Sequence, residues 1–71
     1  MIDTRKVRAR MLMLGLTQRD VANDMEINVA TFNQKINNKR RIYIDEYLKL
    51  CKILKLNTTE EREELLGVAL I

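Results

Sequence analysis

The sequence predicts an all-α fold, a compact five-helix bundle, and three observations lead to that prediction. The chain has 71 residues with no proline and only two glycines, so few positions would interrupt a helix. No segment shows the sustained polar–apolar alternation that is typical of strands. Residues that suit helix N-caps recur along the chain instead, followed by apolar residues at helical spacing. We expect one domain over residues 1–71, because a chain of this length buries a single small core.

The first helix is expected to begin at Asp3 or the next residue and to end at Leu14. Asp3 can cap its first turn, and Val7, Met11 and Leu14 fall on one face. Gly15 then suits the left-handed position at which many helices stop. The basic residues of this helix fall on its outer side, where contact with a partner and simple solvation remain equally open: Arg5, Lys6, Arg8 and Arg10.

A second helix is expected to begin at Thr17, whose hydroxyl can accept a hydrogen bond from an early backbone N–H group. Asp20, three residues on, can reach back to form a capping box. Leu16 and Val21 flank the cap at the spacing of a hydrophobic staple. The inner face of this helix, which should end near residue 25, is expected to contain Val21, Ala22 and Met25.

A third helix repeats this design after a very short gap. Asn28 suits its N-cap, and Ile27 and Phe32 form a second staple. Phe32 and Ile36 are the only large apolar residues inside the helix and share a face. The remaining positions are small, polar or basic and include no acid: Val29, Ala30, Thr31, Asn33, Gln34 and Lys35. We interpret this composition as an outer face that presents amides and methyl groups.

The rest of the chain predicts a polar loop, two further helices and an apolar end. Residues 37–41 form a basic loop, and a fourth helix over about residues 44–55 should turn its core side inward with Ile44, Tyr47, Leu48, Cys51 and Leu54. A short helix beginning at Thr58 or Thr59 should stop at Gly67. Residues 67–71 form an apolar tail that either completes the core or contributes a dimer contact. The methionines at 11, 13 and 25 are expected to fill the core.

The charge distribution favours a binding module over an enzyme. Residues 1–41 carry nine basic and four acidic side chains, whereas residues 42–71 carry four basic and six acidic ones. A positive field on one part of the chain is expected where that part faces a polyanion. Histidine is absent and Cys51 is the only cysteine, so we expect no catalytic residues, no metal site and no cofactor. No apolar run approaches the roughly 18–20 residues of a membrane span and no secretion leader is visible, so we expect a cytoplasmic protein.

Two short helices joined by two or three residues, each with its own cap, read as a helix-turn-helix. The stretch from Leu16 to Ala22, followed by Met25 and Ile27 and then by residues 30–40, resembles the Cro/CI-type, lambda repressor-like DNA-binding domains of the XRE family. The resemblance covers about residues 7–56. It implies a five-helix bundle from a transcriptional regulator, often of a phage or mobile element, that binds two-fold operators as a dimer.

The resemblance also implies roles for individual residues. Base contacts would come from Val29, Ala30, Asn33 and Gln34. Gln18 would contact phosphate and brace the third helix, and the other phosphate contacts would come from Thr17, Asn28, Lys35, Asn37, Asn38, Lys39 and Arg40. The chain has Asn38 where the family usually has glycine, a mild change because Asn tolerates left-handed geometry. Val29 and Ala30 can contact a thymine methyl but cannot form a bidentate hydrogen bond, so base choice would depend on the two amides.

The resulting hypothesis is a sequence-specific, double-stranded DNA-binding transcriptional regulator, a phage-type repressor acting by promoter occlusion. Its expected partners are a palindromic operator and a second copy of the chain, with no small-molecule substrate. The alternative is an antitoxin-like or other protein-interaction module with the same fold, whose docking surface would be the apolar tail. DNA binding without a partner protein favours the first hypothesis, and a requirement for such a partner favours the second.

Overall fold

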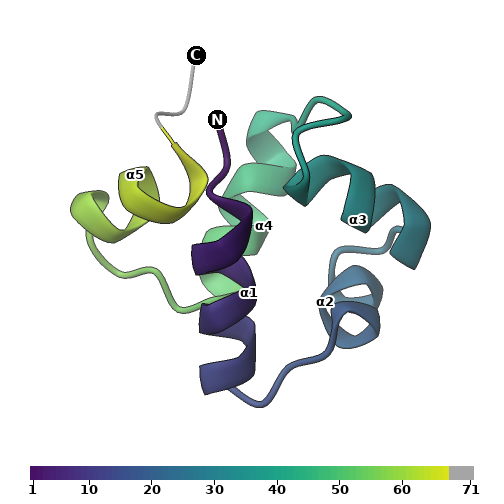
Figure 1. The fold of residues 1–71 in the computed structure, drawn as a ribbon, viewed down its shortest axis with the longest axis horizontal. Helices are drawn as coiled ribbons and strands as arrows, with labels where there is room; N and C mark the ends of the chain where they lie inside the picture. Colours follow the sequence, from purple (N-terminus) through teal and green to yellow (C-terminus); the bar gives the residue numbers. More distant parts are fainter. Residues whose placement is uncertain (68–71) are drawn as a thin grey trace.

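The computed structural model describes residues 1–67, which form five helices and no strand (Figure 1). The all-α prediction is therefore confirmed, and residues 68–71 of the predicted tail at 67–71 lie outside the described residues. In chain order the helices are α1 (Thr4–Met13), α2 (Gln18–Asp24), α3 (Val29–Ile36), α4 (Ile44–Ile53) and α5 (Thr59–Leu66). None of these helices has the length and apolar character that crossing a membrane requires.

Four of the helices begin at a side-chain cap, as their sequences predict. Asp3, Thr17, Asn28 and Thr58 each accept a hydrogen bond from the backbone N–H group three residues ahead. The Asp20 carboxylate also accepts from Thr17 N at 2.9 Å and completes the predicted capping box. The hydrogen bond from Thr17 N, with a smaller contribution from the Thr17 side chain, lowers the pKa of the Asp20 carboxylate. The caps satisfy N–H groups that a helix leaves without intrahelical partners, and so determine where each helix starts.

Helices α1 to α4 all end in the same type of reversal. The residue two positions after each helix has a positive φ, and the next N–H group bonds to a carbonyl five residues back, as Leu16 N does to Met11 O at 2.8 Å. Gly15 fills this position after α1 as predicted, and Asn38 fills it after α3 with a φ of 61°. Glu26 and Lys55 adopt the same geometry, which L-residues other than glycine and asparagine seldom enter. These tight ends keep the loops short and bring successive helices together.

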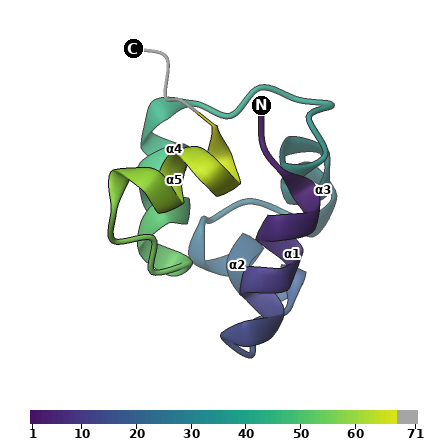
Figure 2. The same ribbon diagram turned by 60° about the vertical axis from the view of Figure 1, so that its left-hand side comes forward.

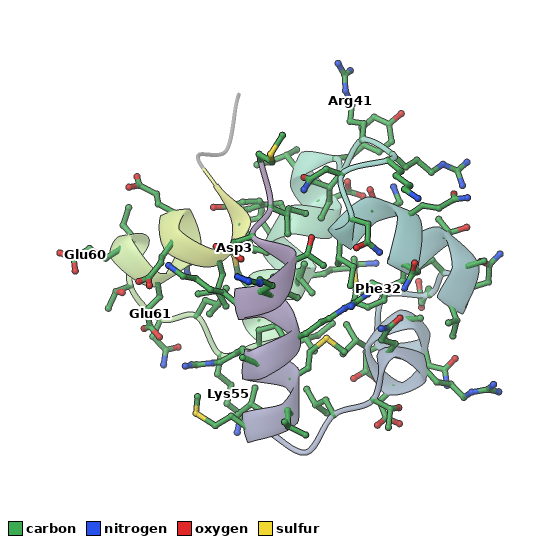
Figure 3. The ribbon with its side chains drawn as sticks, viewed as in Figure 1. Asp3, Phe32, Arg41, Lys55, Glu60 and Glu61 are labelled. Carbon is green, nitrogen blue, oxygen red and sulfur yellow. The ribbon has the colours of Figure 1, made fainter. Side chains whose placement is uncertain are left out.

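The core lies where α1, α2, α3 and α4 meet. Phe32 points from α3 into this centre and has no exposed surface (Figure 3). Its buried neighbours come from all parts of the chain and include Val7, Val21, Ile36, Leu50, Leu54 and Leu56. Cys51 is also buried as predicted, and this burial raises the pKa of its thiol. A raised pKa disfavours the reactive thiolate form.

Three predicted core residues lie on the surface. Ile44, Leu48 and Met13 expose 47%, 54% and 70% of their surface, respectively. The buried residues of α4 are Tyr47, Leu50, Cys51 and the capping Leu54, so three of the five predicted positions are buried and Leu50 takes the place of Ile44 and Leu48. The prediction therefore assigned Leu48 to the core where the fold uses Leu50.

The helices are arranged with α3 and α5 on opposite sides of the molecule (Figures 1 and 2). Helix α2 packs against α3 and α4, and α1 packs against α5. The N-terminal segment runs between these parts: Asp3 N donates to Leu65 O at 2.8 Å, and Ile2 is buried. One side of the molecule thus contains the pair α2–α3 and the loop that follows it, and the acidic helix α5 lies away from both.

Candidate nucleic-acid interface

Helices α2 and α3 form a tightly packed helix-turn-helix. Ala22 and Phe32 have no exposed surface, so the two helices approach closely at these positions. The staple residues Leu16 and Ile27 pack against the core just before the two caps. The turn between the helices needs only residues 25–28, because Glu26 takes the left-handed conformation and Ile27 N bonds to Ala22 O at 3.0 Å. The motif predicted from the caps and staples is therefore present.

The outer face of α3 is small, uncharged and exposed. Ala30 and Gln34 are exposed, and Val29 and Thr31 are partly exposed beside them. The helix contains no acidic residue. With eight residues it is about 12 Å long, which matches the roughly 12 Å width of a DNA major groove. This face therefore presents no carboxylate that a phosphate backbone would repel.

Asn33 lies at the junction of the two helices and not on the open face. Its Nδ2 donates to Gln18 Oε1 at 2.9 Å, and its Oδ1 accepts from Asn37 Nδ2 at 3.0 Å. Asn37 Nδ2 also bonds to Asn33 O at 2.8 Å. Gln18 thus braces α3 through Asn33, in line with the predicted bracing role. Both ends of the Asn33 amide are already bonded within the chain, so of the two predicted amides only Gln34 is presented to the exterior.

The sequence predicts Lys35 on the outer face of α3, and this prediction is wrong. The side chain is only 5% exposed, and its Nζ donates to Arg41 O at 3.0 Å and to Glu46 Oε1 at 2.8 Å. Nζ also lies 5.2 Å from the centre of the Tyr43 ring. Buried lysines are rare unless paired, and these partners occupy the ammonium group inside the protein. The Lys35 ammonium group is therefore not available to contact phosphate.

The signal that places Lys35 inside is present in the sequence. Phe32, Lys35 and Ile36 follow the spacing of a single helix face, but the positive charge of Lys35 favoured a surface position. The information that the sequence does not give is the partner of Lys35, Glu46, which lies in the first turn of α4 and also accepts from Tyr43 N at 3.0 Å. Sequence reasoning did not identify Glu46 as a residue that shapes the basic loop.

The loop between α3 and α4 adds exposed positive charge to this side, to which α2 also contributes Arg19. Lys39, Arg40 and Arg41 are all exposed, and Arg41 points away from the body of the molecule (Figure 3). Asn38 is exposed overall, but its amide is used internally: Nδ2 donates to Ile2 O at 2.8 Å and Oδ1 accepts from Ile2 N at 2.9 Å. The loop is therefore tied to the N-terminal segment, while its basic side chains remain accessible.

The two capping residues predicted to contact phosphate lie at the start of each motif helix. Thr17 and Asn28 are exposed, and their side-chain oxygens accept from Asp20 N at 3.1 Å and Thr31 N at 2.8 Å. Gln18 is partly exposed beside Thr17. Helix N-termini present free backbone N–H groups and a positive partial charge, both of which suit a phosphate.

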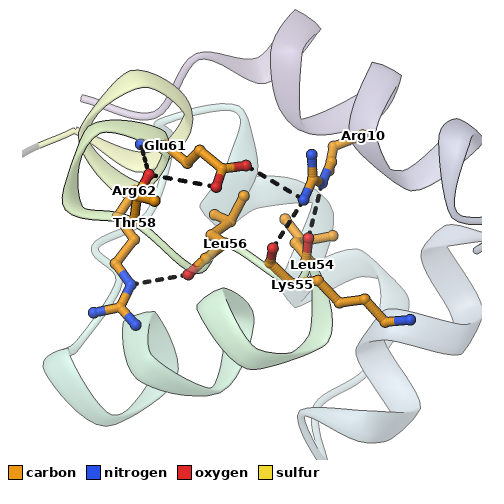
Figure 4. Close-up of polar contacts among 7 residues, drawn as sticks. All are labelled: Arg10, Leu54, Lys55, Leu56, Thr58, Glu61 and Arg62. Carbon is orange, nitrogen blue, oxygen red and sulfur yellow. Dashed lines mark hydrogen bonds and ion pairs between the residues drawn. The ribbon is translucent and has the colours of Figure 1, made fainter.

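Two of the four basic residues of α1, whose role the sequence leaves open, are used within the fold. Lys6 Nζ pairs with Glu64 Oε1 at 2.9 Å. The Arg10 guanidinium bonds to Leu54 O and Lys55 O at 2.9 and 2.8 Å and lies 3.4 Å from Glu61 Oε2 (Figure 4). These contacts secure α1 against α5 and the turn before it. Within residues 1–67 there is no group of metal-ligating side chains that could hold an ion.

Comparison with known proteins identifies the family. The model described as a Cro/C1-type HTH DNA-binding domain matches residues 6–60, well over half of the chain. The matched residues include all of α2, α3 and α4 and the basic loop. No curated protein and no solved structure matches the chain. The match supports binding to double-stranded DNA and a role in transcription regulation.

Proposed function

Because this chain belongs to the Cro/C1-type HTH DNA-binding family, we propose that it is a sequence-specific repressor that inserts α3 into the major groove of an operator. The observation that carries the proposal is the exposed outer face of α3, which contains no acid and is flanked by a basic loop. DNA repels carboxylates and attracts exposed cations. Base edges in the major groove offer hydrogen-bonding patterns that distinguish all four base pairs.

Gln34 is the main base-contacting amide in this proposal. It is exposed on the middle of the outer face, and glutamine can bond to both N6 and N7 of adenine. Val29 and Ala30 contribute apolar contacts, for which the methyl group of thymine is the natural partner. Asn33 does not contact bases in this proposal; its hydrogen bond to Gln18 holds α3 against α2. This division of roles refines the prediction that both amides contact bases.

The phosphate backbone is held on both sides of α3. Thr17, Gln18 and Asn28 lie at the starts of the two motif helices, and Lys39 and Arg40 extend from the loop beyond the end of α3. Asn37 and Asn38 act through the geometry of that loop. Contacts of this kind fix the position of a protein on the duplex and determine the salt dependence of its affinity.

The proposed regulator binds as a homodimer to a palindromic operator, with the two recognition helices roughly 34 Å apart. A domain with dimensions of 26 × 25 × 19 Å covers only a short stretch of duplex, so two copies are needed for a site of useful length. Occupation of a promoter by such a dimer excludes polymerase, which is the simplest route to repression. We propose that the protein acts in the cytoplasm, in association with the nucleoid when bound to DNA, and that it is a regulator of the phage or mobile-element type.

The proposal is tested by selecting duplexes from a randomised pool with the wild-type chain. We expect a palindromic consensus. The Gln34→Ala variant should then lose about 1–3 kcal/mol of discrimination between the selected duplex and a scrambled one, as measured by fluorescence anisotropy. Asn57→Ala, the loss of an exposed amide in the turn between α4 and α5, is the matched control.

Two outcomes would contradict this function. Selection without any consensus would show that the chain does not recognise sequence. An equal loss of affinity for selected and scrambled duplexes in Gln34→Ala would show that α3 does not read bases.

A further inference from the structure

The outer face of α3 offers few groups that could specify a guanine. Val29 and Ala30 have no side-chain hydrogen-bonding group, and the Asn33 amide is bonded to Gln18 and Asn37. Gln34 suits adenine better than guanine, since guanine presents two acceptors in the major groove. No residue of the helix itself therefore offers a pair of hydrogen-bond donors to the two acceptors of guanine.

A guanidinium group from the following loop lies over this same face. Arg40 Nη1 is 3.4 Å from Thr31 Oγ1 and 3.5 Å from Gln34 Oε1. Thr31 and Gln34 lie about one helical turn apart on the outer side of α3. The Arg40 side chain therefore runs back along the helix that is proposed to enter the groove. Arg40 takes part in none of the ion pairs formed within residues 1–67.

The backbone around Arg40 is attached to α3 on both sides. Lys39 N donates to Gln34 O at 2.9 Å, and Arg41 O accepts from Lys35 Nζ at 3.0 Å. The Lys35 ammonium is itself held by Glu46 at 2.8 Å. Arg40 therefore begins from a fixed point at the end of α3, which reduces the conformational freedom that its side chain loses on binding.

We propose that Arg40 is a specificity-determining residue that selects a guanine next to the base contacted by Gln34. The inference rests on the proposed function, since it requires α3 to lie in the major groove. A guanidinium group donates two parallel hydrogen bonds to O6 and N7 of guanine, the commonest specific contact in protein–DNA complexes. Arg40 then contacts a base in place of the phosphate contact that the sequence predicts and the proposed function includes, and Lys39 alone provides the phosphate contact of the loop.

The test compares two Arg→Lys substitutions in the same loop. Arg40→Lys keeps the positive charge but loses the planar pair of donors, and Arg41→Lys is the matched control because Arg41 points away from the body of the molecule. Each variant is titrated by anisotropy against the selected duplex and against duplexes in which each base pair is changed in turn. Arg40→Ala completes the series, and circular dichroism verifies that all variants are folded.

For Arg40→Lys we expect discrimination at one guanine–cytosine pair of each half-site to fall by roughly 5- to 150-fold, the equivalent of about 1–3 kcal/mol. Preferences at the other positions should be retained, and Arg41→Lys should match the wild type. The inference is overturned if Arg40→Lys keeps every preference while Arg40→Ala weakens all duplexes uniformly, which is the signature of a phosphate contact. In that case a loss of specificity in Gln34→Ala would leave the proposed function intact, whereas a pool without consensus would remove both.

Discussion

The loop after α3 and the turn after α4 are both held by a cation that reaches backbone carbonyls, but they differ in burial and in position. Lys35 is almost fully buried and holds the basic loop through Arg41 O and Glu46. Arg10 is about one-fifth exposed and holds the turn through Leu54 O and Lys55 O (Figure 4). Arg62 adds a bond to Leu56 O at 3.0 Å in the same turn.

In both places a cationic side chain donates hydrogen bonds to backbone carbonyl groups, but the two segments that it holds lie in different parts of the molecule. The Arg10 turn joins α4 to α5, far from α3 in both views of the fold (Figures 1 and 2). The Lys35 loop carries the exposed cations next to the proposed DNA-binding helix. A planar guanidinium group satisfies two carbonyls at once, whereas a buried ammonium group needs a carboxylate partner. We therefore expect Arg10 to support stability alone, and Lys35 to support stability and DNA binding together.

The largest expected effect is that of Lys35→Ala on stability. The change removes one partner of a buried ion pair and leaves the Glu46 carboxylate, whose side chain is 16% exposed, without its cation. Breaking such a pair costs about 3–5 kcal/mol, and the residual exposure of Glu46 places our expectation near 3 kcal/mol. Urea denaturation measures the loss.

A double variant sharpens this prediction. Lys35→Met with Glu46→Gln removes both charges but keeps the aliphatic stem and the acceptor for Tyr43 N. It should be more stable than Lys35→Ala, because replacing a buried pair is less costly than breaking it. A Lys35→Ala variant as stable as the wild type would contradict the assignment of Lys35 to the interior.

The sequence anticipated the fold more closely than it anticipated this loop. Caps and staples are local signals, so Asp3, Thr17, Asn28 and Thr58 could be identified from residues within one turn of each other. The Lys35–Glu46 pair joins two helices across eleven positions. Nothing local to either residue indicates that contact, so the positive charge of Lys35 outweighs its helical spacing and the sequence predicts a surface position.

The candidate site shows the same limit. The exposed position of Gln34 follows from helical periodicity, and it was predicted. The inward turn of Asn33 depends on Gln18, fifteen positions away and on another helix. The course of the Arg40 side chain depends on loop geometry that spacing does not determine. The burial of Leu50 on α4, in place of Leu48, also depends on packing against its neighbours.

Arg10→Ala should have the second-largest effect on stability. It removes charge-assisted bonds to the carbonyls that end α4, and hydrogen bonds to charged groups contribute about 1.5–3 kcal/mol. Since Arg10 is partly exposed, water can replace some of these contacts, so we expect a loss of about 2 kcal/mol by urea denaturation. Arg10→Lys should fall between this variant and the wild type. A larger loss than in Lys35→Ala would reverse the order that burial predicts.

Measurements of DNA binding should also distinguish Lys35 from Arg10. Lys35→Met removes the bond to Arg41 O and should free the basic loop, which lowers the salt slope of binding to the selected duplex by about one unit if one phosphate contact is lost. Arg10→Ala should leave this slope unchanged, because the turn that it holds lies away from the loop. Anisotropy titrations at several salt concentrations measure the slope. An equal change in both variants would show that overall stability controls binding, and not the position of the loop.

The smallest effect is expected for Lys6, the exposed member of this series of cations. Its Nζ lies 2.9 Å from Glu64 Oε1, and both side chains are about half exposed, so water and salt screen the pair. The hydrogen bond to Glu64 raises the pKa of Lys6 above its ordinary value of 10.5. A raised pKa in the folded state stabilises the protein at lower pH, and this contribution is lost as the pH rises through the folded value. Lys6→Met should therefore lower the melting temperature less than Arg10→Ala at neutral pH, and the difference from the wild type should shrink with 1 M salt and above pH 10.5. A difference that persists under both conditions would mean that Lys6 stabilises α1 through its aliphatic stem, and the ranking of the three cations by burial would no longer explain their effects.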